Sequence, residues 1–403
     1  MNSGSASKPD STSLSGFGSA LPLAVIYAVG FMSATFLPVW VSAMAEAFNV
    51  SPSRVGLVGS IELGFLAAAS ILTAALPDNG NRRSAIAVAL VVNVAANLLS
   101  TVSSTMTLFL ITRVVAGTTN GFLLATVNRR AGRSASPRKV FAGQTFTIVM
   151  FATLFFTAAP YLLAHWGPGA SFYFAAIAGV VALATVSLIS VTETGLEPEI
   201  ERPRGAATDL GAVLLLAAPT VAFFVHGTVW AYLAPAARNA GASLQTLAYV
   251  LALGGLFNPF APLVAGWIGS GRILARAALI GGIVMFTVCL FCVAGSGNAK
   301  LFAVGLTFQP FFLMFLLPFY LERLSQLDRT GKFVAASSAC LMIGTAVGPT
   351  VGGLIIDYDR IAGLAVFDVG MMAVVLVFTL AGLFRRRSRL DEEPEFAGAR
   401  TYN

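Results

Sequence analysis

The chain has 403 residues, of which 57% are hydrophobic and only 11% are charged, and its mean hydropathy is +0.81. A soluble globular protein carries about 25% charged residues, so this composition excludes an ordinary soluble domain and predicts an integral membrane protein that lies in a lipid bilayer. The net charge of +7 then reflects how basic residues sort across the membrane, and we expect no nucleic-acid partner.

Residues 1–20 are rich in Ser and Gly and contain no basic region followed by an apolar core. This pattern predicts a disordered tail and not a signal peptide. At the other end, the basic and acidic residues of 385–403 predict a second tail.

Twelve apolar stretches between the tails are long enough to cross a membrane, which takes about 20 residues in a helix. Barrel strands would be shorter and would alternate in polarity, so the pattern predicts an all-α integral membrane protein with twelve transmembrane helices. The predicted spans are residues 21–43, 54–77, 84–103, 106–126, 140–163, 170–191, 210–234, 244–269, 274–294, 301–322, 333–356 and 362–384.

Lys and Arg predict the orientation of these helices. If both termini are cytoplasmic, 20 of the 25 basic residues lie on the cytoplasmic side and Arg113 lies inside a span. The opposite side holds only Arg54, Arg238, Lys300 and Arg360. This asymmetry is a strong positive-inside signal, so we expect both termini in the cytoplasm of a cell whose plasma (inner) membrane holds the protein.

Residues 192–209 are acidic, contain Pro and Gly, and cannot span a membrane, so they predict a cytoplasmic linker between two six-helix bundles, 21–191 and 210–384. The bundles share features at matching positions, such as Pro160 in the fifth span and Pro349 in the eleventh. Parallel repeats of this size are typical of secondary transporters, whose substrate site lies between the repeats.

Three sequence elements resemble motifs of the major facilitator superfamily, and the resemblance covers about 21–384. A degenerate loop motif contains Asp78, Arg82 and Arg83, and the fourth helix carries Arg113, Gly117 and Gly121. The eleventh helix carries Gly344, Gly348, Pro349, Gly352 and Gly353, a pattern that the family's drug antiporters have on the fifth helix. Here we interpret it as close helix packing with a proline bend.

The resemblance implies a fold of two pseudo-symmetric bundles, with Asp78, Arg82 and Arg83 as a conformational latch between them. It also implies that helices 1, 4, 7 and 10 line a central cavity. The candidate substrate-binding residues on these helices are Tyr27, Phe31, Thr35, Phe36, Arg113, Asn120, His226, Trp230, Phe308, Gln309 and Phe312.

Glu62 lies inside the apolar stretch from Gly56 to Leu72, where a charge costs on the order of 2.5–3.5 kcal/mol. From the predicted helix ends it lies ~12 Å deep, and Arg113, His226 and Gln309 fall near the same depth. An ion pair between Glu62 and Arg113 would offset the cost.

That pair has two interpretations. It is either a static contact that orients two helices, or a proton-coupling site in which the proton affinity of Glu62 depends on its neighbour. We favour the second, with His226 as a further candidate because imidazole titrates near neutral pH. The small polar face of the fourth helix, which includes Arg113 and Asn120, predicts contact with a water-filled cavity.

We expect no enzyme, no metal site and no cofactor. Cys289 and Cys292 form a C-x-x-C, but no His or second cysteine pair joins them, and Cys340 is also in an apolar stretch. The two histidines, His165 and His226, belong to no catalytic or zinc-binding motif.

The sequence therefore predicts a monomeric, proton-coupled secondary transporter that moves a small organic solute by alternating access. Aromatic, apolar cavity candidates favour efflux by substrate/proton antiport. The alternative is proton-symport uptake of an organic anion such as a carboxylate, with Arg113 as the partner of the anion. Fold resemblance alone does not choose the substrate.

Overall fold

The structure is a computed structural model that describes residues 12–75, 83–133, 137–189, 210–268, 272–327 and 332–384. Within these ranges the chain consists of α-helices joined by short turns and 3-10 segments, and no strand occurs in them. Asp78, Arg82, the linker 192–209 and the terminal segments 1–11 and 385–403 lie outside the described residues.

The helices follow the predicted spans closely. In chain order they are α1 (Thr12–Thr35), α2 (Leu37–Phe48), α3 (Pro52–Ala75), α4 (Arg83–Thr101), α5 (Met106–Arg133), α6 (Pro137–Trp166), α7 (Ala170–Thr185), α8 (Leu210–Trp230), α9 (Leu233–Asn239), α10 (Leu244–Phe257), α11 (Ala261–Trp267), α12 (Arg272–Ala294), α13 (Ala299–Leu327) and α14 (Lys332–Phe384).

In the described part of the chain, ten helical stretches are long and apolar enough to cross a membrane, and the bent pair α1–α2 provides an eleventh. One of the ten, Phe146–Leu188, is 43 residues long and contains two helices, α6 and α7. These helices reverse direction at Gly167, whose φ of 66° favours glycine. The spans thus fit the twelve predicted crossings.

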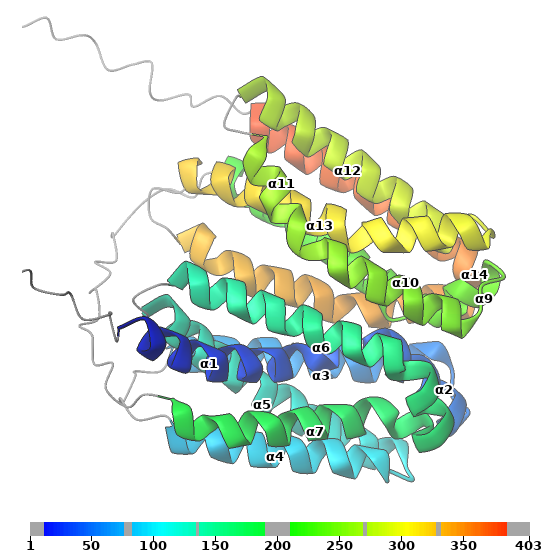
Figure 1. The fold of residues 1–403 in the computed structure, drawn as a ribbon. Helices are drawn as coiled ribbons and strands as arrows, with labels where there is room; N and C mark the ends of the chain where they lie inside the picture. Colours follow the sequence, from blue (N-terminus) through cyan, green and yellow to red (C-terminus); the bar gives the residue numbers. More distant parts are fainter. Residues whose placement is uncertain are drawn as a thin grey trace, which may run out of the picture.

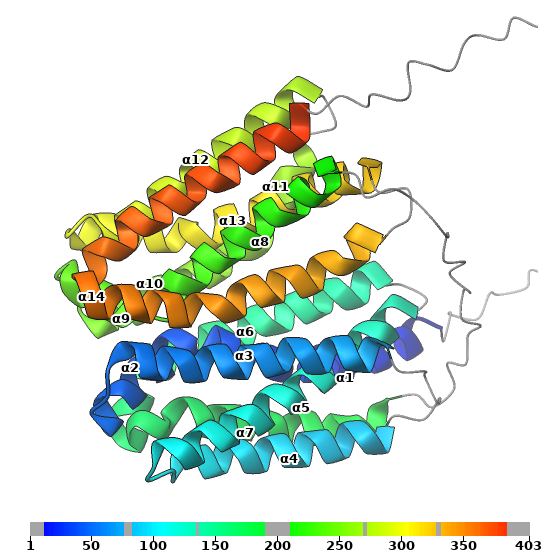
Figure 2. The same cartoon turned by 180° about the vertical axis from the view of Figure 1, so that it is seen from behind.

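Helices α1–α7 lie together in one bundle and α8–α14 in a second one beside it (Figures 1 and 2). The described chain begins at Thr12 and ends at Phe384 at the same end of the molecule, which we call the terminal end (left in Figure 1). We call the opposite end, where α2 and α9 lie, the far end.

The first helix differs from its prediction at both ends. It begins at Thr12, so part of the segment expected to be a disordered tail is helical. It also breaks at Phe36, where α1 and α2 meet at a bend of 48°. Pro38 explains the break, because proline has no N–H to donate to the carbonyl of Ala34 and its ring clashes with a continuous helix.

Two other spans differ in continuity. The predicted span 244–269 is interrupted by the 3-10 segment Asn258–Phe260, where Pro259 cannot donate a helical hydrogen bond. The predicted spans 333–356 and 362–384 are two arms of α14, which turns at the far end near Arg360, a residue with φ of 62° (Figure 2).

Glycines let helices approach closely in both bundles. A Cβ on Gly117 or Gly121 of α5 would lie 2.2 Å from a backbone oxygen of α3, those of Glu62 and Leu66 respectively. In the second bundle, a Cβ on Gly344 would lie 2.4 Å from a backbone oxygen of α8. A Cβ on Gly348 or Gly352 would lie 2.6 Å or 2.4 Å, respectively, from backbone atoms of α8. The interpretation of the glycine-rich motif on the eleventh span as close helix packing is confirmed.

We predict that Gly117→Ala destabilises the protein, because the new methyl group would collide with the backbone of Glu62 and force α3 and α5 apart. Overpacking of this kind costs about 1–3 kcal/mol. The measurement is the apparent melting temperature of the purified protein in detergent. Gly64→Ala is the control, since nothing lies within 4 Å of a Cβ on Gly64. Equal melting temperatures for the two variants would contradict the packing explanation.

Candidate functional site

Glu62 and Arg113 form an ion pair inside the first bundle. Arg113 Nη1 lies 3.3 Å from Glu62 Oε1, and both side chains are fully buried. The pair forms because Gly117 and Gly121, on the same face of α5 as Arg113, bring the backbones of α3 and α5 into contact. Each charge thus offsets the desolvation cost of the other.

A second set of hydrogen bonds holds the guanidinium from α4. Arg113 Nη2 donates to Asn97 Oδ1 at 3.1 Å and to the hydroxyl of Ser100. On its other side, the guanidinium lies over the ring of Phe172, with Cζ 4.3 Å from the ring centre. A cation over an aromatic face is stabilised further where water is excluded.

The polar network continues from Asn97 through α5 to α1. Asn97 Nδ2 donates to Asn93 Oδ1 at 2.9 Å, and Asn93 Nδ2 donates to Asn120 Oδ1 at 2.8 Å. Asn120 Nδ2 then donates to Ser33 Oγ at 3.1 Å. Polar groups from α1, α3, α4 and α5 thus form a continuous chain that includes the ion pair.

Two atoms of the pair remain without a hydrogen bond among the described residues, Glu62 Oε2 and Arg113 Nε. The carboxyl group is therefore held by one oxygen only. Such a group has an oxygen available for a proton without first breaking its contact with Arg113, which is the chemical property that a proton carrier needs.

The face of α5 that carries Arg113 does not have the role expected from its composition. We predicted contact with a water-filled cavity, but Gly117 and Gly121 pack against α3, and Arg113 and Asn120 are buried inside the first bundle. Small residues reduce the distance between helices as well as they line a cavity. The composition of the face therefore could not distinguish the two arrangements.

In the second bundle, the predicted residues His226 and Gln309 form a pair of their own. Gln309 Nε2 lies 2.7 Å from His226 Nδ1, and since an amide N–H₂ only donates, the imidazole nitrogen accepts. Gln309 is buried, and the imidazole lies 5.0 Å from the ring centre of Trp230. The four polar residues predicted at one depth thus form two pairs, one in each bundle.

Trp230 also links the two bundles. Its indole Nε1 donates to the carbonyl oxygen of Ala34 at 3.1 Å. That carbonyl has no helical partner because the residue four positions later is Pro38. The proline that bends the first span therefore also leaves the carbonyl oxygen of Ala34 free to accept a hydrogen bond from the other bundle.

The remaining predicted residues of the first helix lie near the bend. The rings of Tyr27 and Phe31 lie 5.0 Å apart, and Thr35 Oγ1 donates to the carbonyl of Phe31. Phe36 is buried and stacks on Phe155 of α6, with ring centres 3.8 Å apart. Phe36 is thus a packing residue in this conformation.

The two predicted phenylalanines of the tenth span lie on α13. Phe308 is 39% exposed and its ring centre lies 6.2 Å from that of Phe257 on α10. Phe312 is half-buried and contacts Phe311 and Phe315. Among the described residues, neither phenylalanine ring contacts the ring of His226.

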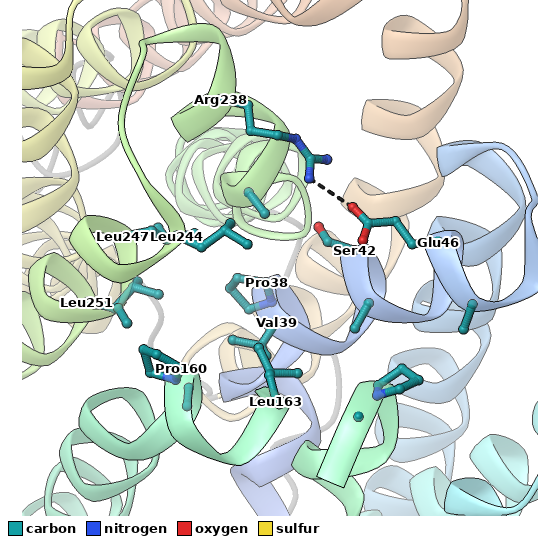
Figure 3. A pocket seen from close by; sticks show the side chains of 17 residues that line it. Pro38, Val39, Ser42, Glu46, Pro160, Leu163, Arg238, Leu244, Leu247 and Leu251 are labelled. Atoms are coloured by element: carbon teal, nitrogen blue, oxygen red, sulfur yellow. Dashed lines mark hydrogen bonds and ion pairs between the residues drawn. The ribbon is translucent and has the colours of Figure 1, made fainter. Parts of the chain in front are cut away.

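A cavity of about 460 Å³ lies at the far end between the bundles (Figure 3). Its walls are mostly apolar and come from α2 and α6 of the first bundle and from α9 and α10 of the second, with Pro38, Leu163 and Leu247 among them. At its rim, Arg238 Nη1 pairs with Glu46 Oε1 at 2.8 Å across the two bundles. None of the residues predicted to bind substrate lines this cavity.

Of the three predicted latch residues, only Arg83 is described. Its Nη2 donates to the carbonyl of Ser187, near the end of α7, so this contact lies within the first bundle. Asp78 and Arg82 lie outside the described residues, and their role stays a prediction.

Sequence reasoning missed two groups of polar residues. Asn93, Asn97 and Ser100 recur at helical spacing in an apolar span, a signal that could have placed them on one face beside Arg113. Asp368 is fully buried on the second arm of α14, where Thr228 Oγ1 lies 2.8 Å from its Oδ1. A single acidic residue in an apolar stretch was the same signal that identified Glu62.

The site contains no obvious place for a metal cofactor. Among the described residues, no three His, Cys, Asp or Glu side chains lie close enough together to hold an ion. What the arrangement offers chemically is a set of buried ionisable and hydrogen-bonding groups.

Several solved structures of transporters share this fold. A bacterial homologue of the human lysosomal transporter Spinster, inward-facing and unoccupied, matches with a TM-score of 0.64 and 15% identity, covering 94% of this chain and 97% of that one. A bacterial homologue of the human drug peptide transporters PepT1 and PepT2 matches with a TM-score of 0.68 and 12% identity, covering 91% and 97%.

The nucleoside transporter NupG, in a mutant form, matches with a TM-score of 0.66 and 12% identity, covering 91% of this chain and all of that one. Identities this low show the fold alone. No curated protein matches the chain. The sequence profile described as Major Facilitator Superfamily matches residues 23–315, which is more than half of the chain. The chain therefore belongs to the major facilitator superfamily.

Proposed function

We propose that this protein is a proton-coupled secondary transporter that exports a small organic solute by alternating access. The observation that carries the proposal is the buried Glu62–Arg113 pair, in which one carboxyl oxygen accepts no hydrogen bond from the described residues. A bundle that needed only packing could have apolar residues at both positions at lower cost. An intramembrane ionisable pair is by default a functional hypothesis.

The state of Arg113 bears on the direction of transport. Uptake of an organic anion needs a cation that the anion can reach, whereas here Glu62, Asn97 and Ser100 all engage the guanidinium. The apolar walls of the far-end cavity also suit a neutral or amphipathic solute better than an anion. Both observations support antiport, and uptake of a carboxylate remains the alternative.

Alternating access requires contacts between the bundles that form and break. Polar contacts of this kind lie towards the far end: Trp230 to Ala34, Arg238 to Glu46, and the amide of Thr350 to Ser60 Oγ at 3.0 Å. We infer that the far end is the outer side and that the described conformation is closed there.

We predict that Glu62→Gln abolishes solute accumulation driven by a pH gradient while solute exchange without a gradient continues, because Gln keeps the size and hydrogen bonding of Glu but cannot ionise. The measurement is proton flux that accompanies solute flux in reconstituted vesicles, after a counterflow screen of pooled metabolites and drugs has identified a solute. Asp357→Asn is the control, since it makes the same carboxyl-to-amide change at an exposed residue.

Arg113→Ala should be more harmful than Glu62→Gln, because it leaves Glu62 buried without its ionic partner. Removing one member of a buried pair costs about 3–5 kcal/mol. If proton movement stays coupled to solute movement in Glu62→Gln, the pair is a structural contact only, and His226 becomes the candidate proton carrier.

The predicted orientation is tested by cysteine labelling. Single cysteines at Ser3 and Lys300 should react from opposite sides of the membrane, because the positive-inside pattern places both termini in the cytoplasm and Lys300 outside. Reaction of both from one side would refute the topology. A cysteine at Arg238 is the matched control for Lys300, since both residues are expected on the outer side.

We predict that Asp78→Asn slows transport and shifts the balance between inward- and outward-facing states, because the latch would stabilise one of them. Solute affinity should change by only a small factor, since Asp78 is expected at the cytoplasmic ends of the helices. The measurements are transport rate, solute binding, and labelling of single cysteines near the far end. A collapse of affinity without a change in labelling would contradict the latch role.

A further inference from the structure

The second bundle has its own buried carboxyl group, which the pair in the first bundle does not use. Asp368 is fully buried, and no Lys or Arg of the described residues forms an ion pair with it. Its Oδ1 lies 2.8 Å from Thr228 Oγ1, and its Oδ2 has no hydrogen-bond partner among the described residues. A carboxylate with one neutral donor would carry most of its desolvation cost uncompensated.

The hydrogen bonds of Thr228 indicate how this cost is avoided. Thr228 Oγ1 lies 2.7 Å from the carbonyl oxygen of Val225 and 2.8 Å from Asp368 Oδ1, yet a hydroxyl has only one proton to donate. A carbonyl oxygen never donates. If the Thr228 proton points to Val225, the proton between Thr228 and Asp368 must therefore belong to the carboxyl group.

We propose that Asp368 is a proton-binding site of the second bundle, with Thr228 as its switching partner. In the protonated form, the Asp368 O–H donates to Thr228 Oγ1 and the Thr228 O–H donates to the Val225 carbonyl. When the proton leaves, the Thr228 hydroxyl rotates to donate to the carboxylate and the carbonyl of Val225 loses that bond. Loss of the proton thus leaves a negative charge on Asp368 and rotates the hydroxyl group of Thr228.

The position of Thr228 gives this change a structural consequence. Thr228 lies on α8 between the two arms of α14, because a Cβ on Gly352 of the first arm would lie 2.4 Å from the Thr228 carbonyl oxygen. Two residues away on either side are His226, which pairs with Gln309, and Trp230, which reaches the other bundle. A charge on Asp368 therefore develops beside the segment of α8 that contacts both arms of α14. The same segment bonds to Gln309 through His226 and to the first bundle through Trp230.

Other titratable groups on the neighbouring elements do not pair with Asp368. The helices that pack against α14 are α3, α8, α12 and α13, with α9 at the far end. Their titratable and charged groups are Arg54, Glu62, His226, Tyr232, Arg238, Arg272, Arg276, Cys289, Cys292, Lys300, Tyr320, Glu322 and Arg323. Glu62 is paired with Arg113, His226 with Gln309, Tyr320 with Thr379 and Arg238 with Glu46.

Infrared spectroscopy of the purified full-length protein in lipid nanodiscs tests the proposal directly, with the proton itself as the probe. A protonated carboxylic acid has a carbonyl stretch that a carboxylate lacks. At neutral pH we expect such a band in the natural protein, its loss in Asp368→Asn, and its retention in Asp357→Asn, which removes an exposed carboxyl from the same helix. A spectrum in which Asp368→Asn removes no such band would overturn the proposal.

Thr228→Val provides a second test that keeps Asp368 in place, in case Asp368→Asn does not fold. Loss of the acceptor should shift the carboxylic-acid band to higher frequency, whereas Thr228→Ser should leave it unchanged. If Thr228→Val moves no carboxylic-acid band, the switching role of Thr228 is wrong. Measurements on Glu62→Gln separate the two carboxyl groups, because the band assigned to Asp368 should persist in that variant.

A contribution of Asp368 to transport rests on the proposed function, but its protonation does not. The infrared band reports a bound proton without any solute, and the coupled flux through Glu62 is measured independently of it. Loss of the band in Asp368→Asn together with uncoupled flux in the natural protein would leave the proton site intact and refute coupled transport. Coupled flux in the natural protein, together with a band that Asp368→Asn does not remove, would refute only the proton site.

Discussion

The ion pair between Glu62 and Arg113 is the interaction on which the architecture of the first bundle depends. A charge in the interior of a membrane protein has no water to stabilise it, so each ionic group needs an opposite charge, directed hydrogen bonds, or both. The first bundle provides both, since α3 contributes the carboxylate and α4 contributes amide and hydroxyl groups to the guanidinium. Gly117 and Gly121 make this geometry possible because no larger residue would let α5 approach α3 so closely.

The second bundle meets the same physical constraint with neutral groups. His226 and Gln309 form a hydrogen-bonded pair that needs no counter-ion, and within the described part of the chain Asp368 hydrogen-bonds only to the hydroxyl of Thr228. The two bundles therefore differ in chemistry although both use glycines to bring a helix pair into backbone contact. In the first bundle the charge is balanced by another charge, whereas in the second, by our proposal, it is balanced by a proton.

The junction between the bundles is built from small contributions. An exposed ion pair such as Arg238–Glu46 is worth about 0–1 kcal/mol, and a neutral hydrogen bond such as Trp230 to Ala34 contributes about 0.5–1.5 kcal/mol. Interactions of this size hold one arrangement without making it permanent. Such a junction suits a protein whose two halves must exchange one set of contacts for another.

The sequence by itself determined the features that depend on local composition. Apolar length defined the membrane spans, and the lone carboxylate at Glu62 with Arg113 at a similar depth predicted a buried ion pair, because a membrane interior penalises a charge wherever it lies along a helix. Only the tertiary structure decided what depends on rotation about each helix axis and on neighbours. It placed Asn93 and Asn97 beside Arg113, and it turned the face with Gly117 towards α3 and not towards a cavity. It also brought Thr228 to Asp368, 140 positions apart, since helix packing and not sequence distance decides which polar groups meet.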